Sequence, residues 1–314
     1  MQRYINGAPA GRRRGFRLTL AAREQLAGYG FISPWVIGFV LFTAGPLLAS
    51  LLISFTDWDL IGSASFVGLH NYDAMLHDRL VWQSLRVTAT YAAGRVPAGI
   101  VLGIVIALLL NQRVRLIGFW RVLYYLPVVL PPVAVSMVWM WIYQPSYGLL
   151  NGLLALVGVR GPAWLGSDIW VIPALIIAGT WTSAGRYLIV YLAGLNAISK
   201  ELYEAAEIDG ASLLQRFFRV TLPMLTPTIF FNLVTGLIDS FKVFTQPYVM
   251  TQGGPDHNSL FFALYLYQNA FNRFQMGYAS ALAWVFVIVV MAFTLLVFRT
   301  ARAWVYYESA EGVV

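Results

Sequence analysis

The sequence predicts an all-α, polytopic membrane protein with six transmembrane helices. Hydrophobic residues make up 59% of its 314 positions and charged residues only 11%, whereas soluble globular chains average about 45–50% apolar and about 25% charged residues. The mean hydropathy is +0.68, and the apolar excess lies in long stretches. Because one crossing needs about 20 apolar residues, six crossings leave room for loops but for no large soluble domain.

Six apolar stretches are the expected transmembrane helices. They are apolar on every face, whereas the strands of a membrane barrel alternate apolar and polar residues. We expect a basic cytoplasmic arm at residues 1–28, a transmembrane domain at 29–300 and a cytoplasmic tail at 301–314. The expected spans are Tyr29–Phe55, Ser84–Leu110, Phe119–Tyr143, Ile169–Leu195, Pro223–Tyr248 and Met276–Phe298.

The distribution of Lys and Arg predicts that both termini are cytoplasmic, because positive charge concentrates on the cytoplasmic side of membrane proteins. In that orientation the outer loops carry only Arg79, Arg160 and Arg273. The same rule accounts for the net charge of +7 without a nucleic-acid partner. The inner basic clusters lie at residues 3–23, 113–121, 200–219 and 299–302.

Several kinds of chemistry are not expected from this chain. It has no Cys, which excludes disulfides and thiol nucleophiles, and its His residues lack metal-ligand spacing, so we expect no metal or other cofactor. Lys200 and Lys242 do not follow Gly as the lysine of an ATP-binding P-loop does. No expected span contains a His or paired carboxylates, which disfavours an intramembrane enzyme.

The polar stretch between the fourth and fifth spans predicts a helix, a tight turn and a second helix on the cytoplasmic side. Ser199 can cap the first helix, and Gly210 is the natural residue to end it. Ser212 and Gln215 have the spacing of a capping box for the second helix. From these residues alone, the loop is either a solvated connector or a docking surface for another protein.

The spelling of this loop resembles the EAA loop of the inner-membrane permeases of binding-protein-dependent ABC importers. That family's pattern is Glu-Ala-Ala, three residues, Gly, nine residues, Ile, one residue and Leu-Pro, and only Val220 departs from it. The string from Lys200 to Ala211 is similar in particular to the carbohydrate-uptake permeases. The matching residues are Glu204, Ala205, Ala206, Gly210, Val220, Leu222 and Pro223.

Other stretches extend the resemblance over nearly the whole chain. Phe66–Tyr72 is similar to an outer loop of these permeases, Met250–Pro255 to the Thr-x-Gly-Gly-Pro turn of sugar permeases, and Gly277–Ala281 to the start of their last helix. The resemblance implies a MetI-like permease fold in the cytoplasmic membrane of a bacterium or archaeon. It also implies a second homologous permease, two cytoplasmic ATPase subunits that bind ATP and Mg²⁺, and an extracytoplasmic solute-binding protein.

In the family that this chain resembles, the EAA loop contacts the ATPase, and the solute lies between the two permeases. The solute is touched there by the helices before and after the loop, which correspond to Trp181–Arg186 and Gly236–Val243. The expected coupling residues are Glu204, Ala205, Ala206, Asp209 and Gly210. The expected residues of the solute path are Trp181, Ser183, Arg186, Gly236, Asp239 and Ser240.

Arg95 and Arg186 fall within the depth of the membrane, where charges are costly and must face protein or water. Asp239 can neutralise one of these arginines or pair with Lys242 on its own helix, so a structural ion pair is an alternative to a role in the path. The favoured function is one permease of an ATP-driven importer for a sugar or related solute. An importer of another solute and an ion-coupled secondary transporter are the alternatives.

Overall fold

A computed structural model describes residues 19–112 and 115–306. Its contacts divide the chain into two units, Met1–Leu52 and Ile53–Val314, which are called here the amino-terminal unit and the main unit. Most of the expected basic arm, the end of the tail and Arg113 lie outside the described residues. The described helices and two short strands confirm the all-α class.

The described part of the amino-terminal unit belongs to one long apolar helix in three segments, α1 (Leu20–Phe39), the π-helical turn η1 (Val40–Ala44) and α2 (Gly45–Ile53), whose last residue begins the main unit. The hydroxyl of Thr19 caps α1 by accepting from the N–H of Ala22. The π-helical turn directly precedes Pro46, which has no N–H to continue the regular ladder. The helix contains most of the first expected span and begins before it, inside residues 1–28.

The main unit is built around two helices that pack along each other, α4 (Arg79–Leu110) and α8 (Val171–Ala197). Small residues permit the contact: a Cβ on Gly99 or Gly103 would lie 2.3 or 2.6 Å from Tyr187. Helix α12 (Thr226–Phe241) packs on α4 and α5 (Ile117–Val129) on α8. These two long helices confirm the second and fourth expected spans within a few residues.

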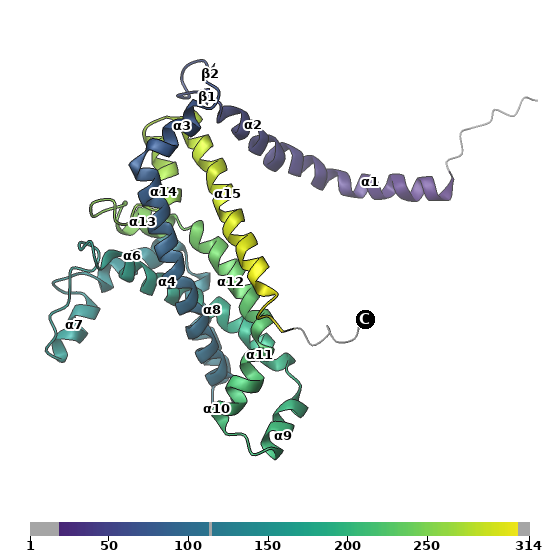
Figure 1. Cartoon of the computed structure of the whole chain (residues 1–314), viewed down its shortest axis with the longest axis vertical. Helices are drawn as coiled ribbons and strands as arrows, with labels where there is room; N and C mark the ends of the chain where they lie inside the picture. The colour runs from purple at the N-terminus through teal and green to yellow at the C-terminus, as the bar shows by residue number, and fades with distance from the viewer. Residues whose placement is uncertain (1–18, 113–114, 307–314) are drawn as a thin grey trace, which may run out of the picture. The chain divides into compact units, whose positions relative to one another are not determined.

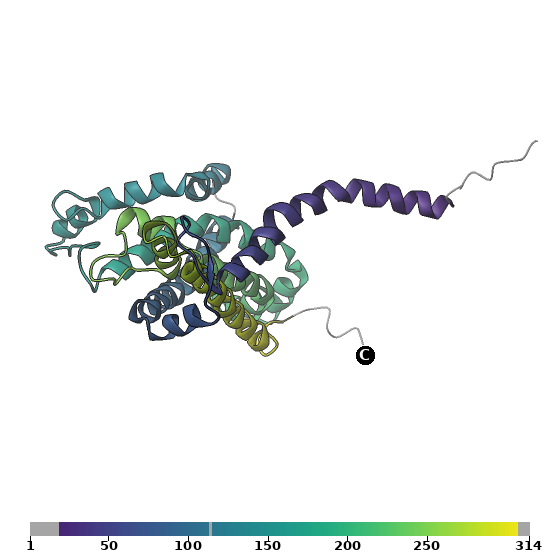
Figure 2. The ribbon, with the colours of Figure 1, turned by 90° about the horizontal axis from the view of Figure 1, so that it is seen from above.

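The third expected span is not one continuous helix. Helix α5 ends at Val129 and α6 (Pro132–Ile142) begins after a bend of 102°. Pro131 and Pro132 cause the bend, because neither has an N–H to donate and the residue before a proline is held in extended conformation, as Leu130 is. Figure 2 shows the teal segment from α5 to α7 (Leu149–Leu156) along one side of the main unit, away from the yellow α15.

The fifth expected span, Pro223–Tyr248, is also broken. It is approached through α10 (Leu213–Arg216), the π-helical turn η2 (Phe217–Thr221) and α11 (Leu222–Met224), which together are bent by 61° from α12. After Phe241 the helix stops and α13 (Thr245–Met250) begins in a new direction. Pro247 explains part of the break, because it cannot donate to the carbonyl of Val243 as a continuous helix would require.

Within residues 19–112 and 115–306, four helices are long and apolar enough to span a membrane, and the count is up to six when each bent pair counts as one span. The fourth of these long helices is α15 (Met276–Ala301), which confirms the last expected span. Figure 1 shows the main unit with α9 (Lys200–Ile208) and α10 at one end and α3 (His70–His77) with the first turn of α15 at the other.

At the end of the main unit opposite α9, residues of Phe66–Tyr72 and Gly277–Ala281, two of the stretches whose sequence resembles the family, pack against the segment after α2. The Asn71 side chain donates to the carbonyl oxygens of Ser54 and Thr56, 2.9 Å from each. A Cβ on Gly277 would lie 1.8 Å from the Thr56 oxygen, so only glycine fits there. The strands β1 (Thr56–Asp57) and β2 (Ser65–Phe66) form a two-stranded antiparallel ribbon at this end.

Asp78 joins three elements at the same end. Its carboxylate caps α4 by accepting from the Leu80 N–H, 2.9 Å away, and also accepts from the hydroxyls of Tyr278 on α15 and Tyr265 on α14 (Phe262–Tyr267), which continues into the π-helical turn η3 (Gln268–Asn272). Burial raises the pKa of Asp78, but these hydrogen bonds and the charge of Arg273 outweigh it, so the pKa lies below the ordinary value.

Candidate solute cavity and coupling loop

A cavity of about 360 Å³ opens among α4, α6, α8, α12 and α13 of the main unit. Its wall combines an aromatic ring, Trp139, with hydroxyl and amide groups and with four charged side chains. The hydroxyl and amide groups belong to Tyr91, Ser136, Thr182, Thr245 and Gln246, and the charged residues are Arg95, Arg186, Asp239 and Lys242. Such a mixture of apolar surface and few convergent polar groups is typical of a site for a small polar ligand.

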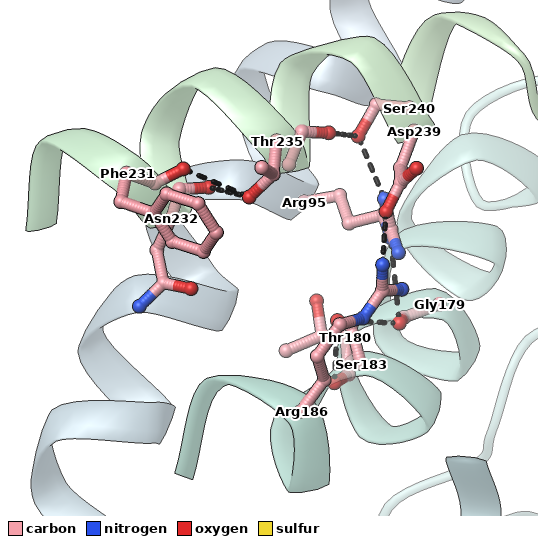
Figure 3. Close-up of polar contacts among 11 residues, drawn as sticks. Arg95, Gly179, Thr180, Ser183, Arg186, Phe231, Asn232, Thr235, Asp239 and Ser240 are labelled. Atoms are coloured by element: carbon pink, nitrogen blue, oxygen red, sulfur yellow. Dashed lines mark hydrogen bonds and ion pairs between the residues drawn. The ribbon is translucent and has the colours of Figure 1, made fainter. Parts of the chain in front are cut away.

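An ion pair between Arg186 on α8 and Asp239 on α12 lies at the cavity wall. The side chains are 49% and 38% exposed, so both remain accessible from the cavity. Figure 3 shows the Arg186 guanidinium reaching from its helix toward the Asp239 carboxylate. Of the partners that the sequence allows for Asp239, the structure selects Arg186 rather than Arg95 or Lys242.

Arg95 is buried between three helices, with only 6% of its surface exposed. Its Nη1 donates to the Ser240 hydroxyl on α12, 2.8 Å away, and its Nε points at the Gly179 carbonyl on α8, at 3.4 Å (Figure 3). The Tyr91 ring lies 5.9 Å from the guanidinium carbon. No carboxylate of the described residues lies within ion-pair distance of Arg95. The groups that contact its guanidinium, namely the Ser240 hydroxyl, the Gly179 carbonyl and the Tyr91 ring, are all neutral.

The structure separates the expected path residues into two groups. Arg186 and Asp239 line the cavity, whereas Ser183, Gly236 and Ser240 are buried in helix contacts. The Ser183 hydroxyl donates to the Gly179 and Thr180 carbonyls of its own helix. Contact of Ser183, Gly236 or Ser240 with a solute therefore stays a prediction that this geometry does not favour.

Gly236 and Trp181 do not line the cavity themselves, and each contacts a neighbouring side chain instead. A Cβ on Gly236 would lie 2.3 Å from the Tyr187 hydroxyl oxygen, so the glycine lets α12 approach α8. The exposed ring of Trp181 meets Trp139 edge to face, with 5.8 Å between centroids, and Trp139 itself lines the cavity. Trp181 is thus one residue removed from the cavity wall.

Sequence reasoning missed several residues of the cavity. Gln246 accepts from the Tyr91 hydroxyl at 3.0 Å and donates to the Leu175 carbonyl at 2.8 Å, which ties α13 to α4 and α8. Tyr91 and Arg95 are four residues apart on one helix face, a signal that was readable in the sequence. Gln246 reaches the cavity only because the helix breaks before Thr245, and no local signal marks that break clearly.

The loop between α8 and α12 has the predicted helix, turn and helix. Ser199 caps α9 by accepting from the Glu201 N–H at 3.2 Å, and Gly210 has the positive φ of +73° that favours glycine. The predicted capping box is present, with Ser212 and Gln215 bonded reciprocally at 2.7 and 3.4 Å. These local predictions are confirmed.

The surface of this loop is open to a partner. Glu204 and Ala205 are exposed, Ile208 is 87% exposed, and Leu213 and Leu214 are also exposed. An ion pair between Glu207 and Arg216, at 3.3 Å, joins α9 to α10. Beside it lies a hollow of about 330 Å³, lined by Ala206, Asp209, Gly210, Ala211, Gln215, Arg216, Arg219 and Val220.

Comparison with known proteins identifies the family. Residues 99–304, which contain the loop and nearly all of the cavity wall, match the family of binding-protein-dependent transport system inner membrane components. The chain belongs to this family. The resemblance of the EAA-like loop therefore pointed to the correct class, an ABC transporter permease of the inner membrane.

The permease is similar over nearly its full length to curated relatives. It is 43% identical over 294 residues to the probable ABC transporter permease protein YesP of Bacillus subtilis, covering 92% of this chain and 94% of YesP. It is 35% identical to the trehalose/maltose transport system permease protein MalF of Thermococcus litoralis, covering 90% and 96% of the two chains.

A solved structure confirms the permease fold. One chain of a bacterial alginate ABC transporter, crystallised in complex with an alginate pentasaccharide-bound periplasmic protein, matches with a TM-score of 0.78. The match covers 90% of this chain and 96% of that chain at 24% sequence identity, so it shows that the fold is shared. Among the described residues of this permease, no group of three or more His, Cys, Asp or Glu could hold a metal ion.

Proposed function

We propose that this permease passes a sugar or a related solute from an external binding protein to the cytoplasm. The observation that carries the proposal is the cavity between α8 and α12, whose wall offers the Trp139 ring and several hydroxyl and amide groups. Aromatic faces and hydrogen-bonding groups together suit the two faces of a sugar ring. The trehalose/maltose permease among its relatives supports the same solute class.

The loop Ser199–Pro223 is proposed to dock on an ATPase subunit, which binds ATP and Mg²⁺ and performs the hydrolysis. This chain is then a transport subunit and not an enzyme. The exposed apolar side chains Ile208, Leu213 and Leu214 support the docking role, because exposed apolar groups that gather at a helix turn suit a protein contact. The Glu207–Arg216 pair supports it too, because it links α9 to α10 directly.

The proposed assembly contains a second homologous permease, two ATPase subunits and an extracytoplasmic solute-binding protein, in the cytoplasmic membrane. Both termini are proposed to be cytoplasmic. The distribution of Lys and Arg in the sequence supports this orientation, because the segments proposed to face outward carry only Arg79, Arg160 and Arg273. A reporter that is active only outside the cytoplasm should be silent after Val314 and active near Asp256, and the reverse pattern contradicts the orientation.

The proposed function is tested by deletion, complementation and purification. In cells of the source organism that lack this chain, uptake of one or more labelled oligosaccharides should fall to background and return with the wild-type gene. The tagged chain should copurify with an ATPase and a second permease. Unchanged uptake of every sugar in the deletion strain, or purification without an ATPase, contradicts the proposal. Uptake of amino acids or peptides instead supports an importer of another solute.

A further inference from the structure

We propose that the solute of this permease is an anionic saccharide, and that the cavity binds its carboxylate, sulfate or phosphate group through Arg95. The inference rests on the proposed function and narrows its solute class. The observation behind it is an imbalance of charge at the cavity wall. Among the residues that line the cavity, Arg95, Arg186 and Lys242 carry positive charge and only Asp239 carries negative charge.

The single carboxylate is already engaged. Asp239 pairs with Arg186, and the structure shows no ion pair between Asp239 and either of the other two cations. Lys242, just beyond the end of α12, is exposed and makes no ion pair with a described residue. The wall that this chain contributes therefore carries a net positive charge, which a solute with a negative group would balance.

Arg95 gives this charge a fixed position. The Arg95 guanidinium is a positively charged, planar fork of N–H donors. Its hydrogen bonds to Ser240 and Gly179 use Nη1 and Nε, and they hold the guanidinium plane between α8 and α12. No described residue accepts a hydrogen bond from its Nη2, although Arg95 lines the cavity. Nη2 of the guanidinium is thus available to donate to an acceptor on a ligand in the cavity.

The arrangement is better suited to a ligand than to bracing alone. The hydrogen bonds from Arg95 go to the Ser240 hydroxyl and the Gly179 carbonyl. A neutral N–H donor would serve these two acceptors equally well. Arg95 is buried, and an attraction between charges is stronger at a buried site than in water. A guanidinium also binds carboxylate, sulfate or phosphate oxygens with matching geometry. The neutral groups around it, Tyr91, Thr182 and Gln246 among them, remain for the hydroxyls of the saccharide.

The test compares uptake of charged and neutral saccharides by cells of the source organism, with and without this chain. Three labelled acidic pools are used: uronate oligosaccharides, sulfated oligosaccharides and sugar phosphates. The matched neutral pool consists of the uronate oligosaccharides after reduction of their carboxylates to alcohols, together with malto- and cello-oligosaccharides. We expect uptake of at least one acidic pool to depend on the chain, and the pool that is carried identifies the anionic group.

Two variants then test the cavity. Arg95→Gln should lower chain-dependent uptake of the acidic pool by about tenfold or more, the loss of a charge-assisted hydrogen bond, and the exposed Lys242→Gln should lower it by a smaller factor without affecting folding. The matched control is Arg86→Gln, an exposed arginine of the same helix that does not line the cavity. The amount of each variant in the membrane is measured by immunoblot.

The outcomes are distinct from those of the proposed function. If the chain copurifies with an ATPase but carries only neutral saccharides, the anionic class is wrong and the importer stands. If Arg95→Gln and Lys242→Gln both carry the acidic pool at the wild-type rate, binding through Arg95 is wrong, although the solute is anionic. If no pool depends on the chain and no ATPase copurifies, the proposed function itself fails. Loss of acidic uptake in Lys242→Gln but not in Arg86→Gln supports the inference even if Arg95→Gln does not fold.

Discussion

Arg186 and Asp239 form an ion pair that links the two helices on either side of the loop Ser199–Pro223. Arg186 lies on α8, which ends at Ala197, and Asp239 lies on α12, which begins at Thr226 after the loop. Any change in the spacing of these helices at this level must lengthen or break the pair. Because the pair also lines the cavity, one contact joins the proposed solute site to the helices that carry the proposed ATPase contact.

The first prediction concerns this pair. Because both side chains are about half exposed, Arg186→Met and Asp239→Leu should each lower the free energy of unfolding by no more than about 1 kcal/mol, yet each should strongly impair uptake. The double variant should remove both charges without restoring uptake, since the groups serve the path. Uptake and thermal melting of the purified complex are the measurements.

A rescue by the double variant carries the opposite meaning. If Arg186→Met with Asp239→Leu restores uptake that either single change destroys, the pair is a structural brace, because removing both members of a pair costs less than leaving one charge alone. The pair would then be withdrawn from the solute path. Matched levels of all three variants in the membrane are required for the comparison.

The sequence predicted what local chemistry decides. Ser199, Gly210 and the Ser212–Gln215 box were correct because caps depend on residues two or three positions apart. The expectation that Arg95 faces protein or water followed from its depth alone, and the structure buries it in protein. The break after Phe241 was not predicted, because proline is tolerated inside membrane helices and Pro247 alone does not say whether the helix bends or stops. The role of Ser183 in the solute path stays a prediction, because the direction of its side chain depends on the helices packed around it.

The second prediction concerns the turn that ends α9. Gly210→Pro cannot adopt a φ of +73° and removes the N–H that donates to the Glu207 carbonyl at 3.0 Å, so ATPase copurification and uptake should be lost. Gly158→Pro is a matched control. Gly158 has a φ of +77°, donates to the Ala155 carbonyl at 3.0 Å and lies in the loop after α7, so its replacement should leave ATPase copurification intact. Normal copurification with Gly210→Pro contradicts the docking role.

The third prediction separates packing from solute contact at Gly236. A Cβ there would lie 2.3 Å from the Tyr187 hydroxyl oxygen and 3.4 Å from its Cζ, so Gly236→Ala should destabilise the protein by about 1–3 kcal/mol. Removing the hydroxyl makes room, and Gly236→Ala with Tyr187→Phe should recover most of the melting temperature. Gly118→Ala, which meets no atom within 4 Å, is the control. If the double variant melts as low as Gly236→Ala, the steric account is wrong.

The last prediction concerns the pH dependence of the contacts around Asp78. Burial raises the pKa of this carboxyl, but the hydrogen bonds from Tyr265, Tyr278 and the Leu80 N–H together lower the pKa by more than burial raises it. The pKa in the folded protein therefore lies below the unfolded value of about 3.9. A depressed pKa contributes stability that is fully present above the unfolded pKa and is lost as pH falls through the folded pKa. The melting temperature of wild type should therefore exceed that of Asp78→Asn by a constant amount from about pH 8 to about pH 5, and the difference should shrink below about pH 4.

The matched control for this prediction is Asp73→Asn, which replaces an exposed carboxyl on α3. A difference that stays constant below pH 4, or grows as the pH falls, shows that the ionised carboxylate is not what holds α4, α14 and α15 together.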